Sequence, residues 1–192
     1  MSEEEITPEE FARIQEEEFG VSPEERARID AKMSATLAEI RAGHEPKEGY
    51  ADAIHNFGEE QFREALPEII NALTSSDERQ RYMALHVLAF HFRLKEYKYA
   101  AMDMLLHDPD EDCRQQAAAG LGSLMKNTGD YEALHVLAQV IHNDHETDLI
   151  RSVAYRAMHT IVHYDRNQQK QFTVTLFTPD FQIDWAFVDT YL

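Results

Sequence analysis

Apolar residues recur at every third or fourth position through the middle of the chain, which is the spacing of one face of a helix. Three such stripes stand out: Leu66, Ile69, Ile70 and Leu73; Tyr99, Met102, Leu105 and Leu106; and Leu134, Leu137, Val140 and Ile141. Each stripe runs into a polar turn, and each turn is followed by a second helical segment with small alanines. The pattern predicts helix pairs, in which alanine lets neighbouring helices approach closely.

The turn and the helix after it are repeated three times. The copies are Leu73 to Leu88, Leu106 to Leu121 and Ile141 to Met158. In the first two, Asp77, Arg81 and Ala84 recur at Asp110, Arg114 and Ala117, a shift of 33 residues. The third copy has two extra residues in its turn and two more before its alanine, a change that repeat arrays tolerate. Stacked pairs bury apolar faces that one pair leaves exposed. We therefore expect an all-α fold, a short α-solenoid of helical hairpins with atypical N- and C-terminal caps.

The second copy also carries a family resemblance. Its segment DPDEDCRQQAAAGLGSL, from Asp108 to Leu124, resembles the Asp-x-x-x-Arg-x-x-Ala-x-x-x-Leu core of HEAT-like repeats, particularly those of the phycobilisome-lyase type. The resemblance extends over roughly residues 64–165 and implies an α-α superhelix. It also implies that the shared acidic and basic positions are structural: Asp77, Asp110, Arg81, Arg114 and Arg151. Members range from scaffolds to lyases, hydroxylases and DNA glycosylases, so the resemblance leaves the activity open.

Helix start signals extend the array toward the N-terminus. Thr7-Pro8-Glu9-Glu10 and Ser22-Pro23-Glu24-Glu25 each combine a capping residue, a proline in the first turn and a glutamate three residues after the cap. They predict helices to about Phe19 and from Pro23 to about Arg41. The second helix is expected to pair with residues 50–57 as a degenerate first unit. Within the array, Asp108 and Pro109 are expected to be the cap and first residue of a second helix.

The C-terminal segment is rich in aromatic residues. Phe172, Val174 and Leu176 alternate as a short strand would, and Thr178-Pro179-Asp180 predicts a short helix with Phe181, Trp185 and Val188 on one face. We expect a cap over the last repeat, and a partner-binding surface is the alternative. The expected divisions are an acidic helical segment at 1–22, the repeat array at 23–165 and the aromatic cap at 166–192. Within the array, the units are expected at 23–58, 62–93, 95–127 and 130–165.

Charge narrows the classes of partner. The net charge is −18, and residues 1–25 contain ten acidic residues and one arginine, which gives −9. Such an imbalance disfavours direct binding to nucleic acid or an anionic membrane, since phosphate contacts need clustered Lys and Arg. It favours solubility or a basic protein partner. The sequence shows no membrane span or secretory signal and has one cysteine, Cys113, so we expect a cytoplasmic protein.

No set of residues in the sequence indicates catalysis or a cofactor. A nucleophile elbow, a phosphate-binding loop and a dinucleotide-binding turn are all missing. Among the ten histidines, the strongest metal candidates are His159 with His163 and the loop at residues 142–148, and neither has a full ligand set. We therefore expect no catalytic residue, no metal and no cofactor, and regard an enzyme as the less favoured class.

The leading hypothesis is a non-enzymatic protein-protein interaction module, a scaffold or adaptor that binds a partner polypeptide on its curved face. The candidate partner-binding residues are Tyr82, His86 and Phe90 on one second helix, Tyr155 and His159 on another, and Trp185 in the tail. Two alternatives stay open. One is an acidic inhibitor or immunity-type protein that covers a basic partner, and the other is a bilin lyase-like or tetrapyrrole-chaperone protein. The sequence leaves the oligomeric state undetermined.

Overall fold

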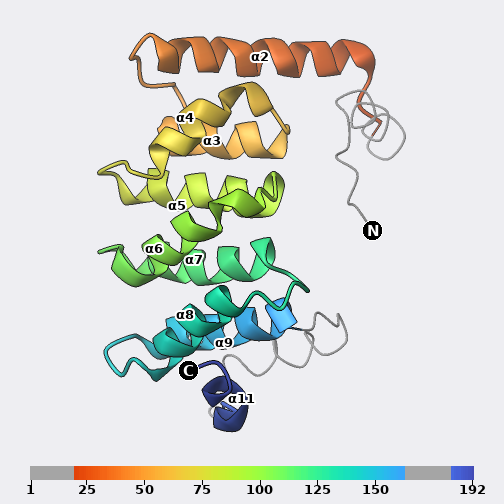
Figure 1. Cartoon of the computed structure of the whole chain (residues 1–192). Coiled ribbons are helices and arrows are strands. Elements are labelled where there is room, and N and C mark those ends of the chain that lie inside the picture. Colours follow the sequence, from red (N-terminus) through yellow and green to blue (C-terminus); the bar gives the residue numbers. More distant parts are fainter. Residues whose placement is uncertain (1–19, 163–182) are drawn as a thin grey trace.

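The protein is a stack of helix pairs, seen side-on in Figure 1. The computed structural model describes residues 20–162 and 183–192, and within these ranges it contains helices and no strand. The pairs are α2 (Pro23–Arg41) with α3 (Tyr50–Glu59), α4 (Leu66–Ala72) with α5 (Glu78–His86), α6 (Lys98–His107) with α7 (Glu111–Leu124), and α8 (Tyr131–His142) with α9 (Asp148–Val162). The all-α solenoid expected from the repeats is confirmed.

Short turns of other helix types join the pairs. The 3₁₀ turns η1 (Arg63–Ala65) and η3 (Lys95–Tyr97) lead into α4 and α6. The π-helical turn η2 (Val87–His91) continues α5. The short helix α11 (Trp185–Asp189) lies beneath the last pair, close to the C-terminus (Figure 1).

The helix starts follow the capping signals in the sequence, with one correction. Ser22 caps α2 by accepting a hydrogen bond from the Glu25 backbone N–H at 3.2 Å, and α2 runs from Pro23 to Arg41 as predicted. The prediction that Asp108 and Pro109 begin a helix is wrong. Asp110 is the N-cap of α7, accepting from the backbone N–H of Cys113 at 2.9 Å. The helix predicted from Thr7 to Phe19 lies outside the described residues.

Two of the repeated arginines connect one unit to the next, and the third binds within its own unit. Arg81 binds the Asp108 carboxylate and also donates to the Ser75 carbonyl within its own turn. Arg114 does the same one unit later, with Glu146 and the Asp108 carbonyl. In the third copy, Arg151 donates to the Ile141 carbonyl at 2.8 Å. The aspartates Asp77 and Asp110 cap the second helices. These contacts support the structural roles that the family resemblance implies.

The core runs the length of the stack between the two rows of helices. The second helices α3, α5, α7 and α9 contact one another in that order, and each also contacts its own first helix. One buried cluster is centred on α7, α8 and α9, another on α3, α4 and α5, and Leu73 packs against both. Within the described ranges, none of the helices is both long enough and apolar enough to cross a bilayer.

The helix α11 covers the end of the last pair. Val188 is fully buried, and the backbone carbonyl of Tyr191 lies 2.7 Å from Nδ1 of His135 in α8. The helix starts at Trp185 with Asp184 as its N-cap. The predicted strand at residues 172–176 and the predicted start at Thr178 fall outside the described residues, as does Phe181. Trp185 is 42% exposed, whereas Val188, three residues further along the same helix, is buried.

Candidate functional site

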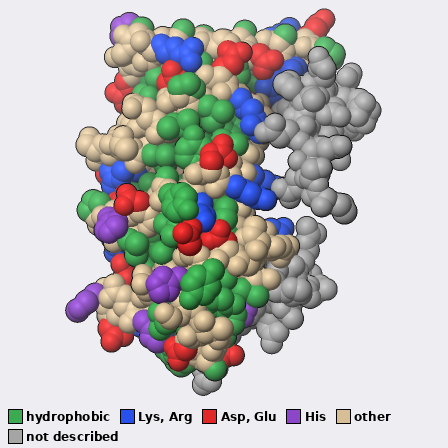
Figure 2. Space-filling view, in the orientation of Figure 1, with side chains coloured by type: hydrophobic (Ala, Val, Ile, Leu, Met, Phe, Trp, Pro, Cys, Tyr) green, Lys and Arg blue, Asp and Glu red, His purple; other side chains and the backbone are tan. Residues whose placement is uncertain are grey.

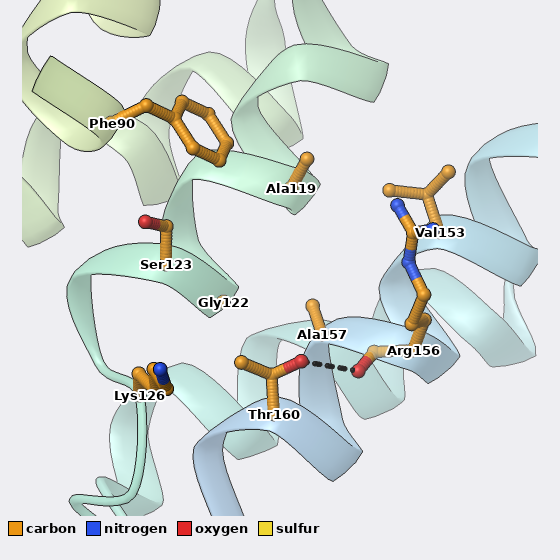
Figure 3. Close-up of a pocket in the computed structure, with 9 residues that line it drawn as sticks. All are labelled: Phe90, Ala119, Gly122, Ser123, Lys126, Val153, Arg156, Ala157 and Thr160. Atoms are coloured by element: carbon orange, nitrogen blue, oxygen red, sulfur yellow. Dashed lines mark hydrogen bonds between the residues drawn. The ribbon is translucent and has the colours of Figure 1, made fainter. Parts of the chain in front are cut away.

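A groove lies on the side of the stack that the second helices form, where η2, α7 and α9 meet (Figure 3). We call this side the second-helix face. The groove has a volume of about 320 Å³. Its lining comprises Phe90, Ala119, Gly122, Ser123, Lys126, Val153, Arg156, Ala157 and Thr160. No acidic side chain is among these residues.

Small residues form the floor of the groove. A Cβ atom on Gly122 would lie 2.9 Å from the Cβ and 3.0 Å from the Cα of Ala157, so glycine lets α7 approach the α9 backbone closely. Ser123 turns its hydroxyl to the Ala89 carbonyl at 3.1 Å, and Thr160 turns its own to the Arg156 carbonyl at 3.0 Å. Both polar groups are thereby satisfied within the protein. The floor presents small, mostly apolar surface to an incoming group.

The rim of the groove carries one aromatic ring and two cationic side chains. Figure 3 shows Phe90 on η2 at one end, Lys126 beyond the end of α7, and Arg156 directed along α9 toward Val153. An apolar floor with a few placed polar groups is the usual composition of a binding site. Chemically, the groove suits an apolar side chain next to a carboxylate or a backbone carbonyl.

Three of the predicted partner-binding residues lie together beside this groove. Tyr82 stacks on His86 with 6.4 Å between ring centroids, and His86 is 5.1 Å from Phe90. All three side chains are half-buried. The helical spacing that suggested one shared stripe therefore does bring these rings into contact.

The other three predicted residues lie near α11. Tyr155 is 4% exposed, and its hydroxyl accepts a hydrogen bond from the Asp184 backbone N–H at 3.3 Å. His159 stacks on Phe187 at 4.5 Å. Trp185 lies 4.9 Å from His142 and stays exposed. Of the three, only Trp185 presents much surface to solvent, because α11 packs over the other two.

Exposed tyrosines on the opposite side were not predicted. We call the side formed by α4, α6 and α8 the first-helix face. Tyr99 on α6 is 62% exposed and Tyr131 on α8 is 58% exposed. The Tyr99 hydroxyl donates to Glu132 at 2.9 Å. Figure 2 shows hydrophobic side chains divided by charged and histidine side chains on the side facing the viewer. Tyr99 belongs to one of the apolar helical stripes, so the sequence pattern suggested that it is buried, whereas Tyr131 lies outside those stripes.

A group of three histidines is the second feature missed at the sequence level. His55 on α3 and His86 and His91 at the end of the next second helix place one possible ligand atom each within 4.8 Å of the others. In the ranges that the structure describes, this is the one group of three or more such side chains. The positions considered from the sequence differ, since His142 contacts Asp189 at 2.9 Å and His163 is outside the described residues.

Comparison with protein families agrees with the repeat pattern. Residues 34–122 match the family model of HEAT repeats, a stretch that runs from within α2 to within α7. This match supports assignment to the HEAT-like repeat superfamily, and the residues it covers are HEAT repeats. Neither the curated proteins nor the solved structures include a significant match to the chain. The narrower likeness to the phycobilisome-lyase type remains a resemblance.

Proposed function

We propose that this chain is a non-enzymatic scaffold or adaptor that binds a segment of a partner protein in the groove of the second-helix face. HEAT repeats in general support protein interaction, and the open side of a helical stack is where such arrays bind. The observation that carries the proposal is the groove itself, with its small-residue floor and the ring of Phe90 at one end.

The rim predicts the chemistry of the bound segment. An aliphatic or aromatic side chain would fill the floor beside Phe90, and an adjacent acidic group would meet Lys126 and Arg156. The net charge of −18 acts differently, because it governs the approach of the whole partner and favours one with basic surface elsewhere. A partner with a basic body and a locally acidic, apolar anchor satisfies both conditions.

The test is site-specific photo-crosslinking with full-length protein in extract from the native host. A photoreactive residue replaces Ala119 in the groove or, as the matched control, Leu106 on the first-helix face, which is 42% exposed. We expect one protein to crosslink from position 119 and not from position 106. The same protein should be lost when the groove also carries Phe90→Ala or Arg156→Glu.

Two outcomes would contradict the proposal. Crosslinking from position 106 that is insensitive to the groove substitutions would assign binding to the first-helix face. Turnover of an added bilin by the wild type but not by the groove variants would make the protein a lyase-like enzyme. Repeating the crosslinking at higher salt tests the acidic-inhibitor alternative, because binding through net charge weakens steeply as salt rises.

A further inference from the structure

We propose that His55, His86 and His91 form a binding site for a divalent transition-metal ion of the zinc type. The three imidazoles join two units, since His55 lies on α3 and the other two lie at the end of the neighbouring second helix. Ring centroids are 6.1 Å apart for His55 and His86, 5.8 Å for His55 and His91, and 5.3 Å for His86 and His91. No residue of the proposed groove floor takes part.

The spacing of the three imidazole nitrogens fits a zinc site that has not yet closed around its ion. Zinc holds imidazole nitrogens at about 2.0–2.1 Å, which sets tetrahedral ligand atoms roughly 3.4 Å apart. The three ligand atoms here lie within 4.8 Å of one another. Closing the difference takes shifts of on the order of 1 Å, which side-chain rotation supplies without moving the helices.

The π turn places two of the three histidines on one side of the helix. His86 and His91 are five residues apart, and five residues span about 1.4 turns of an α-helix, which would direct them to different sides. In η2 the Phe92 N–H instead bonds to the Val87 carbonyl at 2.9 Å, five residues back. The wider turn brings the two imidazoles together. Such π turns occur often at functional sites.

The packing of α3 on η2 then brings in His55. Gly58 has no side chain, and a Cβ there would lie 2.7 Å from a Val87 methyl group and 3.2 Å from the His91 ring. The glycine therefore allows the two helices to approach closely. Gln61, held at a positive φ of 53°, donates from Nε2 to the His91 carbonyl at 3.2 Å and holds η2 against the end of α3.

The outer nitrogen of His55 has the partner that a metal-bound imidazole usually has, and that of His86 lies next to an amide that can supply one. Nε2 of His55 lies 3.4 Å from a carboxylate oxygen of Glu59, and Nδ1 of His86 lies 3.1 Å from the side-chain amide nitrogen, Nε2, of Gln116 on α7. Metal-binding histidines commonly hydrogen-bond a carboxylate or a carbonyl through the second ring nitrogen. When Nε2 of His86 binds the ion, its Nδ1 carries the proton. A half-turn of the Gln116 side-chain amide then brings the amide oxygen to that N–H as its acceptor.

One nitrogen of the group is buried without a hydrogen bond. Nδ1 of His55 is inaccessible to solvent and has no hydrogen-bond partner among the residues that the structure describes. A buried polar atom of this kind is costly unless something binds it.

Three protein ligands leave a fourth position for water. The His55 side chain is 37% exposed as a whole, although its Nδ1 is inaccessible, so solvent borders the site. Imidazole ligands suit zinc, copper and nickel better than calcium or magnesium, which prefer oxygen. We therefore expect zinc, and cobalt as its spectroscopic substitute, to bind with one ion per chain, whereas magnesium does not compete.

The test uses untagged full-length protein freed of metal by chelation. Cobalt titration should give the intense visible absorption of four-coordinate cobalt, saturating at one ion per chain, and zinc should abolish it. His55→Gln and His91→Gln should each weaken zinc binding at least about 100-fold, and Glu59→Gln about 10-fold to 100-fold, as for an outer partner. His107→Gln is the matched control, because that exposed histidine also neighbours a carboxylate, at 3.0 Å. It should bind as the wild type does.

Far-UV circular dichroism melting of each variant separates lost ligands from lost fold. The proposal is overturned if the wild type binds no zinc at about 100 μM, or if folded His55→Gln and His91→Gln bind it unchanged. A weak six-coordinate cobalt spectrum with several ions per chain overturns it equally. None of these measurements depends on a protein partner, so they test the metal site independently of the scaffold function.

Discussion

The Arg81 guanidinium in α5 holds the Asp108 carboxylate of the next unit through two hydrogen bonds of 2.8 Å. The side chains are 12% and 5% exposed, so this ion pair lies within the junction between two repeats. Burial alone would raise the pKa of Asp108, but the hydrogen bonds and charge of Arg81 outweigh it and lower the pKa. The carboxylate is therefore ionised and ties neighbouring units together.

Breaking this pair should destabilise the array. We expect Arg81→Ala to lower the free energy of unfolding by about 3 kcal/mol, since it leaves a buried carboxylate without its cation. Urea denaturation measures the loss. Arg79→Ala on the same helix is the control, because Arg79 is 74% exposed and its carboxylate partner Asp52 is 3.8 Å away, and it should change stability by less than about 0.5 kcal/mol. Equal losses for the two variants would contradict the structural role of Arg81.

Close packing of α7 on α9 should make Gly122 intolerant of a side chain. Gly122→Ala places a Cβ 3.0 Å from the Ala157 backbone, and we expect a net loss of about 1–2 kcal/mol after the gain in helix propensity. Gly120→Ala in the same helix meets only the Ala89 Cβ at 3.3 Å and Leu85 atoms beyond it, so it should be near neutral. Chemical denaturation of both variants decides the point, and a neutral Gly122→Ala would show that the helices can separate freely.

The buried thiol should be inert. Burial first, and then the nearby Asp108 charge, raise the pKa of Cys113 to about 12, and the thiol donates to the Glu78 carbonyl at 3.2 Å. We expect thiol-reactive dyes at pH 8 to label the folded protein at least about 100-fold more slowly than the urea-unfolded protein, because the thiolate is the reactive form. Labelling of the folded chain at the unfolded rate would mean that α7 opens readily.

Acid should weaken the contact between α9 and α11. Burial lowers the pKa of His159 below its usual value of 6.5, against the opposing charge of Asp184. The folded protein therefore binds fewer protons than the unfolded one just below pH 6.5, so the stability from neutral His159 is complete above that pH and declines as pH falls. Melting temperatures from pH 7.5 to 5 should fall less for His159→Phe than for the wild type. His107→Gln should follow the wild type, and a His159→Phe curve parallel to the wild type would refute this role.

Capping residues and repeat spacing explain which helix starts could be predicted from the sequence alone. Ser22 and Pro23 fixed the start of α2, because a cap and a first-turn proline act within four residues of chain. The same local signals predicted Asp108 as the cap of α7. That prediction was wrong, because Asp110 caps the helix and Asp108 binds Arg81, which is distant in the chain. Local signals compete with tertiary contacts that a single segment does not contain.

The candidate surfaces show the same limit. Tyr82, His86 and Phe90 were found from the sequence because they share one helical stripe. The groove was not, because its lining comes from three helices and depends on the close approach of Gly122 to Ala157. The exposure of Tyr155 could not be read from its own helix, because α11 packs over it.

By itself, the sequence determined the repeat and its helix pairs, because both follow from periodicity, whereas the structural roles of the shared arginines were implied by the family resemblance. Only the tertiary structure decided that His55, His86 and His91 meet. Their meeting requires a π turn in one helix and a glycine contact with another. Neither has a signal in residue spacing, since both arise from how two units pack together.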